Sequence, residues 1–316
     1  MSPVVVFAYS EVGYRCLKAL LAAQAEVAWV VTHRDDPNES RWYRSVAELA
    51  AASGVAAAEY ESLSATECLR VVRGIAPDFL FSFYFRKMLA PALLKTARRG
   101  ALNMHGSLLP RYRGRAPINW AIVHGEARTG ATLHYMTEKP DAGDVVDSQA
   151  VDIGVNDTAL EVSIKVADAA EVVMRRSWPA LLAGTAPRRP QDLASGSYFS
   201  GRKPADGRID FARSAWDIHN LIRAVAPPFP GAFADIAGGR LELLGSRWSD
   251  ERAQNAADAP RLYAESGNLY LDCIDDKRLH ITHATLAGQA LTAAALESRR
   301  QEFHLAAPVR PFGALA

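Results

Sequence analysis

Strand-like and helix-like segments alternate through the first half of the chain, and this alternation restricts the fold more than any other feature of the sequence. Val4–Tyr9 and Phe79–Tyr84 are uninterrupted apolar runs, which is the pattern of strands buried on both faces of a parallel sheet. Between them, Ser10–Ala23 places apolar side chains at helical spacing, and Val27–Thr32 is a further apolar run. Repeated strand–helix units of this kind predict a doubly wound, mostly parallel α/β sheet.

The composition of the chain changes after residue 185. Residues 186–207 are rich in Pro, Gly, Ser and charged residues, so we interpret them as a linker. Beyond them, short β-like runs separated by Gly, Asp and Asn predict a small barrel or sandwich. We therefore expect a catalytic domain over residues 1–185, a linker over 186–207, a β-rich domain over 208–306 and a loose tail over 307–316.

Charge and cysteine content exclude several functional classes. The formal net charge of +1 gives no global field that would attract nucleic acid or an anionic membrane. Cys16, Cys68 and Cys273 are odd in number and form no CxxC, so we expect neither a disulfide framework nor a zinc ribbon. The N-terminus is typical of a first strand, not a signal peptide, and no apolar stretch approaches the ~20 residues of a membrane span. We expect a cytoplasmic protein with no metal, membrane or nucleic-acid partner.

The stretch NMHGSLLPRYRGRAP, from Asn103 to Pro117, combines Asn, His, arginines and chain breakers directly after an apolar run. Asn103 and His105 are two residues apart on a predicted strand, so their side chains point to one face. They also lie at the end of that strand, where ligands bind in sheets of this class. Asp141 follows in KPDAGDV, which has the Pro and Gly of a tight loop.

An amide, an imidazole and a carboxylate together suit acyl-type transfer through a tetrahedral intermediate. Asn103 would hold the oxyanion, His105 would move protons, and Asp141 would orient the ring and raise its pKa. No serine or cysteine nucleophile is placed beside them, which favours direct attack by the substrate. The alternative is that His105 is a hydrogen-bonded histidine at a strand end and Asn103 a turn former.

The second half of the same stretch has an arginine at every other position. The guanidinium groups of Arg111, Arg113 and Arg115 match the oxygens of phosphates and carboxylates, although a solvated charged loop is the alternative. We expect Arg111 and Arg113 to contact a nucleotide diphosphate. The first strand–helix junction reads YSEVG and not GxGxxG, which weighs against a dinucleotide cofactor.

The blocks NMHGSLLPRYRGRAP and GATLHYMTEKPDAGDVV resemble the folate-dependent formyltransferases, and the resemblance runs from about Val4 to His304. It implies that 10-formyltetrahydrofolate is the formyl donor and that the second domain is an OB-like β-barrel. It also implies that His105 protonates the departing folate nitrogen, that Asn103 stabilises the oxyanion and that Asp141 raises the pKa of His105. The residues implied to hold the folate are Lys87, Met88, Leu89, Arg115, Thr137, Glu138, Lys139 and Pro140.

Within the family, FAYSEVG, THRDDP, FSFYFRKML and GRAPINW resemble the enzymes that formylate UDP-4-amino-4-deoxy-L-arabinose. That substrate would imply a role in lipid A modification and polymyxin resistance. Phe85 replaces an expected Tyr, and PPFPGAF replaces a loop containing Trp. The bifunctional relatives continue into a decarboxylase domain, and we do not expect that activity in this chain.

Three alternatives stay open from the sequence. Methionyl-tRNA formyltransferase is disfavoured because residues 205–316 hold 12 basic and 14 acidic side chains, whereas a polyanion needs a basic surface. Hydrolysis of formyl-folate would use the same three residues with water in place of the amine. A folate- or nucleotide-binding module without catalysis is the third. The sequence does not predict the oligomeric state.

Overall fold

The protein consists of two compact units in a computed structural model that describes residues 2–305, apart from residues 38, 255 and 300. Unit 1 holds Met1–Ile118, Arg128–Asp152 and Val162–Gly201, and unit 2 holds Asn119–Ala127, Ile153–Glu161 and Arg202–Ala316. This division differs from the predicted boundaries, because residues 186–201 belong to unit 1 and two short segments of the first half belong to unit 2. The predicted tail, 307–316, lies outside the described residues.

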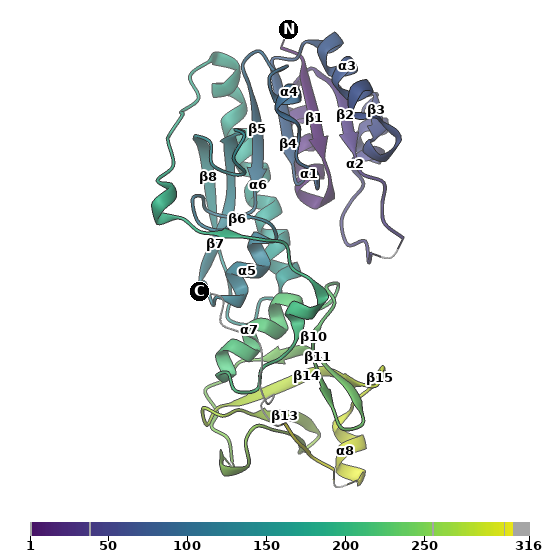
Figure 1. The fold of residues 1–316 in the computed structure, drawn as a ribbon, viewed down its shortest axis with the longest axis vertical. Coiled ribbons are helices and arrows are strands. Elements are labelled where there is room, and N and C mark those ends of the chain that lie inside the picture. Colours follow the sequence, from purple (N-terminus) through teal and green to yellow (C-terminus); the bar gives the residue numbers. More distant parts are fainter. Residues whose placement is uncertain (1, 38, 255, 300, 306–316) are drawn as a thin grey trace. The chain divides into compact units, whose positions relative to one another are not determined.

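Unit 1 is built on a seven-stranded sheet in the order β3-β2-β1-β4-β5-β7-β8 (Figure 1). Neighbouring strands from β3 to β5 pair in parallel, and β7 and β8 are antiparallel. The predicted mostly parallel α/β sheet is therefore confirmed. In chain order the strands are β1 (Val4–Ala8), β2 (Val27–Thr32), β3 (Ala57–Glu59), β4 (Phe79–Phe83), β5 (Gly100–His105), β7 (Arg128–Tyr135) and β8 (Val145–Asp152).

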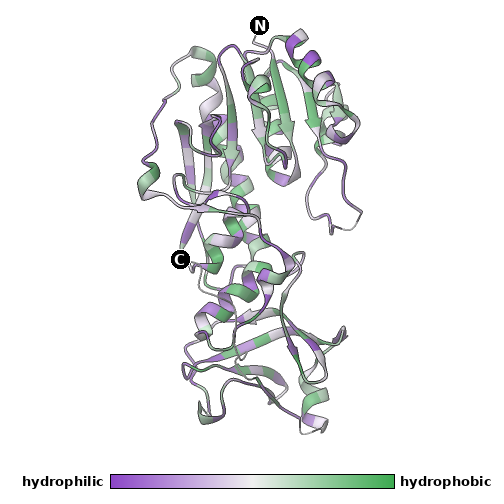
Figure 2. Ribbon diagram, in the orientation of Figure 1, coloured by the Kyte–Doolittle hydropathy of each residue, from purple (hydrophilic) through white to green (hydrophobic). Residues whose placement is uncertain are grey.

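Helices cover both faces of this sheet, because its central strands are apolar on both sides (Figure 2). On one face, Phe79 and Phe81 pack edge-on against Trp178, at ring-centroid distances of 5.9 and 6.2 Å. On the other face, Val5 and Leu80 join a buried cluster with residues of α3 and α4. The helices of unit 1 are α1 (Ser10–Ala22), α2 (Val46–Ala52), α3 (Ala65–Ile75), α4 (Pro91–Leu94) and most of α6 (Ala159–Ala183), whereas most of α5 (Pro117–Val123) belongs to unit 2. None of the described helices is long and apolar enough to cross a membrane.

Residues 186–201, which the sequence predicts as a linker, are hydrogen-bonded to unit 1. Arg189 and Val145 exchange backbone hydrogen bonds of 2.8 and 3.0 Å. Further on, β9 (Tyr198–Phe199) pairs in parallel with β6 (Arg113–Gly114), which lies within the motif singled out in the sequence. The Pro, Gly and Ser content of this segment therefore reflects an irregular but attached path over unit 1.

Unit 2 contains an antiparallel, curled sheet in the order β10-β11-β14-β13-β12-β16, which confirms the predicted β-rich second domain. The helix α7 (Ala215–Val225) is capped at its N-terminus by Ser214, whose side chain accepts a hydrogen bond from the N–H of Asp217. The remaining elements are β10 (Ala232–Ile236), β11 (Gly239–Arg247), β12 (Arg261–Glu265), β13 (Asn268–Asp272), β14 (Arg278–Leu286), β15 (Gln289–Ala290), α8 (Ala293–Arg299) and β16 (Phe303–His304).

Candidate active site

The structure brings Asn103, His105 and Asp141 together at the carboxyl end of β5. Asn103 Nδ2 lies 3.4 Å from Asp141 Oδ1, and His105 Nδ1 lies 3.6 Å from the same oxygen. Asn103 and His105 reach one partner because side chains two apart on a strand share a face. Asp141 comes from the loop between β7 and β8, and its backbone is left-handed with a φ of 51°. The carboxyl ends of β1 and β4, where the strand order reverses, lie at the same edge of the sheet.

The imidazole of His105 is buried between two hydrogen-bond acceptors. Its Nε2 lies 2.8 Å from the carbonyl oxygen of Tyr112, so this nitrogen carries a proton and donates. Its Nδ1 faces the carboxylate of Asp141. Burial lowers the pKa of His105 below its ordinary value, while the charge of Asp141 and the Tyr112 carbonyl oppose that shift. Asp141 therefore acts in the predicted direction on the pKa, but burial outweighs it.

The carboxylate of Asp141 is held in its ionised form. Burial alone would raise its pKa, but the nearby His105 and His134 and the N–H of Gly114 outweigh burial and keep this pKa well below its usual range. The Gly114 N–H donates to Asp141 Oδ2 at 2.8 Å. The site thus holds a fixed negative charge beside an imidazole, which stabilises the imidazolium whenever it forms.

His134 is a fourth member of the cluster that the sequence did not single out. It lies on β7 directly opposite Asn103 in the strand register, and it is 1% exposed. Its Nδ1 donates to the carbonyl of Tyr135 at 2.9 Å, so Nε2 accepts when the ring is neutral, and both nitrogens donate when the ring is protonated. That atom lies 3.2 Å from Asn103 Nδ2 and 3.4 Å from Asp141 Oδ1. Every residue of β7 after Arg128 is buried, so polar and apolar residues do not alternate along it, and its pairing with β5 is a contact between distant segments that the sequence of β7 does not indicate.

The segments that the resemblance assigns to folate differ in exposure. Met88 is 66% exposed, although it is apolar, and Lys87 is also exposed. Leu89 is instead 8% exposed and packs in the hydrophobic cluster on one face of the sheet. Residues 137–140 are exposed and follow Met136, which packs against that same cluster. The exposed side chain of Met88 therefore leaves apolar surface in contact with water.

The three arginines of the motif differ in their surroundings. Arg111 is exposed, with its guanidinium 5.6 Å from the centre of the Tyr112 ring. Arg113 is half-buried, and its Nε is buried without a hydrogen-bond partner. Arg115 is exposed, and its backbone N–H donates to Phe199 O at 2.9 Å. Of the three, Arg113 has the strongest physical reason to meet an anion, because a buried N–H of a cation otherwise lacks an acceptor.

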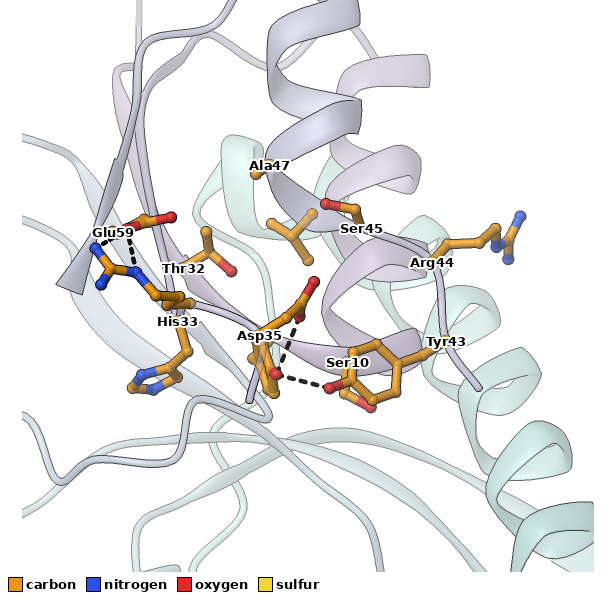
Figure 3. A pocket seen from close by; sticks show the side chains of 12 residues that line it. Ser10, Thr32, His33, Asp35, Tyr43, Arg44, Ser45, Ala47 and Glu59 are labelled. Carbon is orange, nitrogen blue, oxygen red and sulfur yellow. Dashed lines mark hydrogen bonds and ion pairs between the residues drawn. The ribbon is translucent and has the colours of Figure 1, made fainter. Parts of the chain in front are cut away.

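A separate small hollow of about 70 Å³ lies at the carboxyl ends of β1 and β2 (Figure 3). The Tyr9 hydroxyl donates to Asp35 at 3.1 Å and shares a hydrogen bond of 2.6 Å with the Tyr43 hydroxyl. Thr32 and Ser45 add further hydroxyls to the lining. This hollow is therefore polar, and it opens at the same edge of the sheet as His105. Among the residues that the structure describes, no group of three or more His, Cys, Asp or Glu side chains could hold a metal ion.

Two family models match this chain. A model described as formyl transferase matches residues 4–177, and one described as formyl transferase, C-terminal domain, matches residues 202–299. The first match spans the β5 motif and the Asp141 loop, and the second spans most of unit 2.

Solved structures with this fold include several formyltransferases. An N-formyltransferase from Helicobacter canadensis, in complex with folinic acid and dTDP-3-aminofucose, is 19% identical with a TM-score of 0.70, over 92% of this chain and 100% of that one. A 4-N formyltransferase from Francisella tularensis is 19% identical with a TM-score of 0.61, over 76% and 95% of the two chains. HypX from Aquifex aeolicus, in complex with tetrahydrofolic acid, is 16% identical with a TM-score of 0.63, over 93% of this chain and 46% of that one.

At these identities the solved structures establish the likeness of fold, whereas the family models cover the sequence of both units. Together with the buried cluster of an amide, two imidazoles and a carboxylate, they define the class of this enzyme: the chain belongs to the formyltransferase family.

Proposed function

We propose that this enzyme transfers the formyl group of 10-formyltetrahydrofolate to the amine of a nucleotide-linked amino sugar. The observation that carries the proposal is the cluster of the buried His105 with the partly buried Asn103 and Asp141, which supplies an oxyanion donor and a proton carrier. The cysteines that could act as nucleophiles are all buried, and Cys16 and Cys273 have raised pKa values because of burial. Direct attack by the acceptor amine therefore fits better than an enzyme-bound acyl group.

Each residue of the cluster has one role in the proposed reaction. The neutral amine attacks the formyl carbon, a C–N bond forms, and the formyl oxygen gains the negative charge that the amide of Asn103 stabilises. His105 gives a proton to the folate nitrogen as its bond to the formyl carbon breaks, and the proton lost by the amine replaces it on the ring. Asp141 favours the protonated ring throughout.

The folate is proposed to lie on the surface formed by residues 87–89 and 137–140, with Arg115 nearby. The exposed side chain of Met88 supports this placement, because a ring seated on it would cover apolar surface that otherwise faces water. Leu89 is expected to support the segment from below, since its side chain is buried. Folate supplies the formyl group here and needs no metal.

The acceptor is proposed to be UDP-4-amino-4-deoxy-L-arabinose, which would connect the enzyme to lipid A modification and polymyxin resistance. The local sequence resemblance supports this sugar, and the dTDP-3-aminofucose bound to the Helicobacter canadensis enzyme supports the wider class of nucleotide-linked amino sugars. Arg113, and with it Arg111, is proposed to meet the diphosphate, because the buried Nε of Arg113 has no other acceptor.

The test is folate release from 10-formyltetrahydrofolate, followed by absorbance, for the wild type and for His105→Ala. The acceptors are UDP-4-amino-4-deoxy-L-arabinose, a dTDP-amino sugar, methionyl-tRNA and none. We expect turnover with the UDP sugar and a loss of about 10²- to 10⁴-fold in His105→Ala. The exposed His304, on β16, provides the control variant His304→Ala, which should keep the wild-type rate.

Each other outcome has a defined meaning. Turnover with the dTDP sugar alone would support the proposed chemistry but reject the UDP sugar and its pathway. Turnover with methionyl-tRNA alone would reject amino sugars as the substrate class. Turnover without an acceptor identifies a hydrolase. Wild-type activity in His105→Ala, with the fold intact, contradicts the mechanism.

A further inference from the structure

One distant segment of the chain contacts both loops that flank the imidazole of His105. We call residues 189–199 the strap. The ring lies between the carbonyl of Tyr112 at Nε2 and the carboxylate of Asp141 at Nδ1, and neither group is on the same strand as His105. The strap is hydrogen-bonded to the backbone of both, although Ser197 lies 85 residues after Tyr112 and Gln191 lies 50 residues after Asp141.

Gln191 holds the Asp141 side. Its Nε2 donates to the carbonyl oxygens of Asp141 at 3.0 Å and of Gly143 at 2.6 Å. These two carbonyls belong to Asp141, whose backbone is left-handed, and to the residue two positions after it, so Gln191 fixes the loop directly after the Asp141 side chain. Immediately beyond, Arg189 and Val145 exchange two backbone hydrogen bonds, which anchor the strap to the start of β8.

Ser197 holds the Tyr112 side. Its hydroxyl accepts a hydrogen bond of 2.8 Å from the N–H of Tyr112, and its carbonyl accepts one of 3.0 Å from the N–H of Arg113. The Tyr112 ring stacks on Phe199 at a centroid distance of 5.3 Å and an interplanar angle of 15°. Tyr112, whose carbonyl accepts from His105, is therefore held in place by its own N–H, by its ring and by the N–H of the next residue, Arg113.

We propose that Gln191 and Ser197 are positioning residues, which set the distances from His105 to the Asp141 carboxylate and to the Tyr112 carbonyl. This proposal rests on the proposed function only where it treats His105 as the group that carries the proton. The contact from His105 to Asp141 is longer than a hydrogen bond, so its strength follows distance by Coulomb's law and depends on how firmly the Asp141 loop is held.

The matched variants remove hydrogen bonds and keep shape. Gln191→Met deletes both N–H donors from a side chain of similar length, and Ser197→Ala deletes one hydroxyl. Gln149→Met is the control, because Gln149 lies on β8 and its Nε2 donates to Ala150 O, not to either loop. Ser62→Ala is the second control, since this exposed hydroxyl bonds Glu59 O.

The primary readout is the pKa of His105, measured by NMR titration of its ring protons and assigned from their absence in His105→Ala. Asp141 and His134 are the titratable groups that face this ring. Asp141 and the Tyr112 carbonyl both raise the pKa of His105, so loosening either one should lower it. We expect a fall of about 0.5 unit or more in Gln191→Met and in Ser197→Ala. The two controls should titrate like the wild type.

The second readout is the pH dependence of kcat for formyl transfer. The pH at which kcat falls because His105 loses its proton should move to lower values in both variants, while KM for the folate stays unchanged. An unchanged His105 titration in both variants, with wild-type thermal unfolding, overturns the proposal. If Gln191→Met does not fold, Ser197→Ala alone decides it. A shifted titration in a protein that formylates no amine would uphold the strap and reject the proposed function, so the two failures are distinguishable.

Discussion

His105 in unit 1 and His219 in unit 2 are both buried, and burial lowers the pKa of both. The Nδ1 of His219 lies 2.8 Å from Ser246 Oγ, and its Nε2 lies 2.9 Å from Val155 O. Burial, reinforced by the charge of Arg223, lowers the pKa of His219 to about 4. A ring in this environment stays neutral near pH 7 and ties α7 to its neighbours.

His105 has one different neighbour, and that neighbour changes what the ring can do. Both rings have a backbone carbonyl on Nε2, but Nδ1 of His105 faces the carboxylate of Asp141 where Nδ1 of His219 faces a hydroxyl. A carboxylate stabilises the imidazolium against burial, whereas a hydroxyl bonds equally to a neutral ring. Burial and two hydrogen-bond partners alone therefore mark a structural histidine, and the added negative charge marks a proton carrier.

Removing that charge should have the largest effect. In Asp141→Asn, only the Tyr112 carbonyl still opposes the effect of burial on His105, so the pKa of His105 falls and the protonated fraction at pH 7 decreases. We expect kcat to fall about 10²-fold. We also expect the decline of kcat with rising pH to occur at a lower pH than in the wild type. Steady-state kcat between pH 5 and 9 measures both effects. Asp152→Asn, at a side chain that is 86% exposed, is the control, and an unchanged pH dependence of kcat in Asp141→Asn would disprove the role of the charge.

The converse change should make His219 resemble His105. In Ser246→Asp, a carboxylate replaces the hydroxyl at Nδ1 of His219, and we expect its pKa to rise by about one unit or more. The wild-type pKa of about 4 lies below the unfolded value of ~6.5, so this histidine stabilises the fold above pH 6.5 and loses that contribution toward pH 4. The variant should lose less stability over that range. NMR titration of His219, with Ser246→Asn as the uncharged control, tests the shift.

The sequence predicts the centre of the site well because its signals are local. Asn103 and His105 are two apart at the end of an apolar strand, and Asp141 lies in a loop with clear Pro and Gly breakers. The alternation of strand and helix predicts the sheet for the same reason, since each buried strand is a continuous apolar run.

The parts that sequence reasoning missed depend on contacts between distant segments. His134 belongs to the site only because β7 pairs antiparallel with β5, and nothing in its own segment indicates that pairing. The strap has the composition of a linker, and its attachment through Gln191 and Ser197 is visible only once the loops are placed. The sequence could likewise not predict the direction in which the pKa of His105 shifts. Burial lowers this pKa and the charge of Asp141 raises it, and the degree of burial decides which effect is larger.

The smallest effect that we expect concerns His134. This residue sharpens the comparison of His105 with His219, because it places a second imidazole beside Asp141 in the site of His105. Its Nε2 accepts from Asn103 Nδ2, so it fixes the direction in which the amide donates. In His134→Leu the amide loses this partner, and we expect kcat to fall about tenfold, less than the 10²- to 10³-fold typical of losing an oxyanion donor itself. His134→Gln, which keeps an acceptor, should recover part of the rate.

A double-mutant cycle with Asn103→Ala separates positioning from an independent role. If His134 acts by orienting the Asn103 amide, His134→Leu should cost almost nothing once that amide is gone, and the two effects on kcat will not add. If His134 acts through the Asp141 carboxylate, which is 3.4 Å from the same Nε2, the full loss will persist in the Asn103→Ala background. Additive losses would therefore indicate that His134 assists proton transfer and not oxyanion binding. In that case the effect of His134→Leu on kcat should also change with pH as His105 titrates.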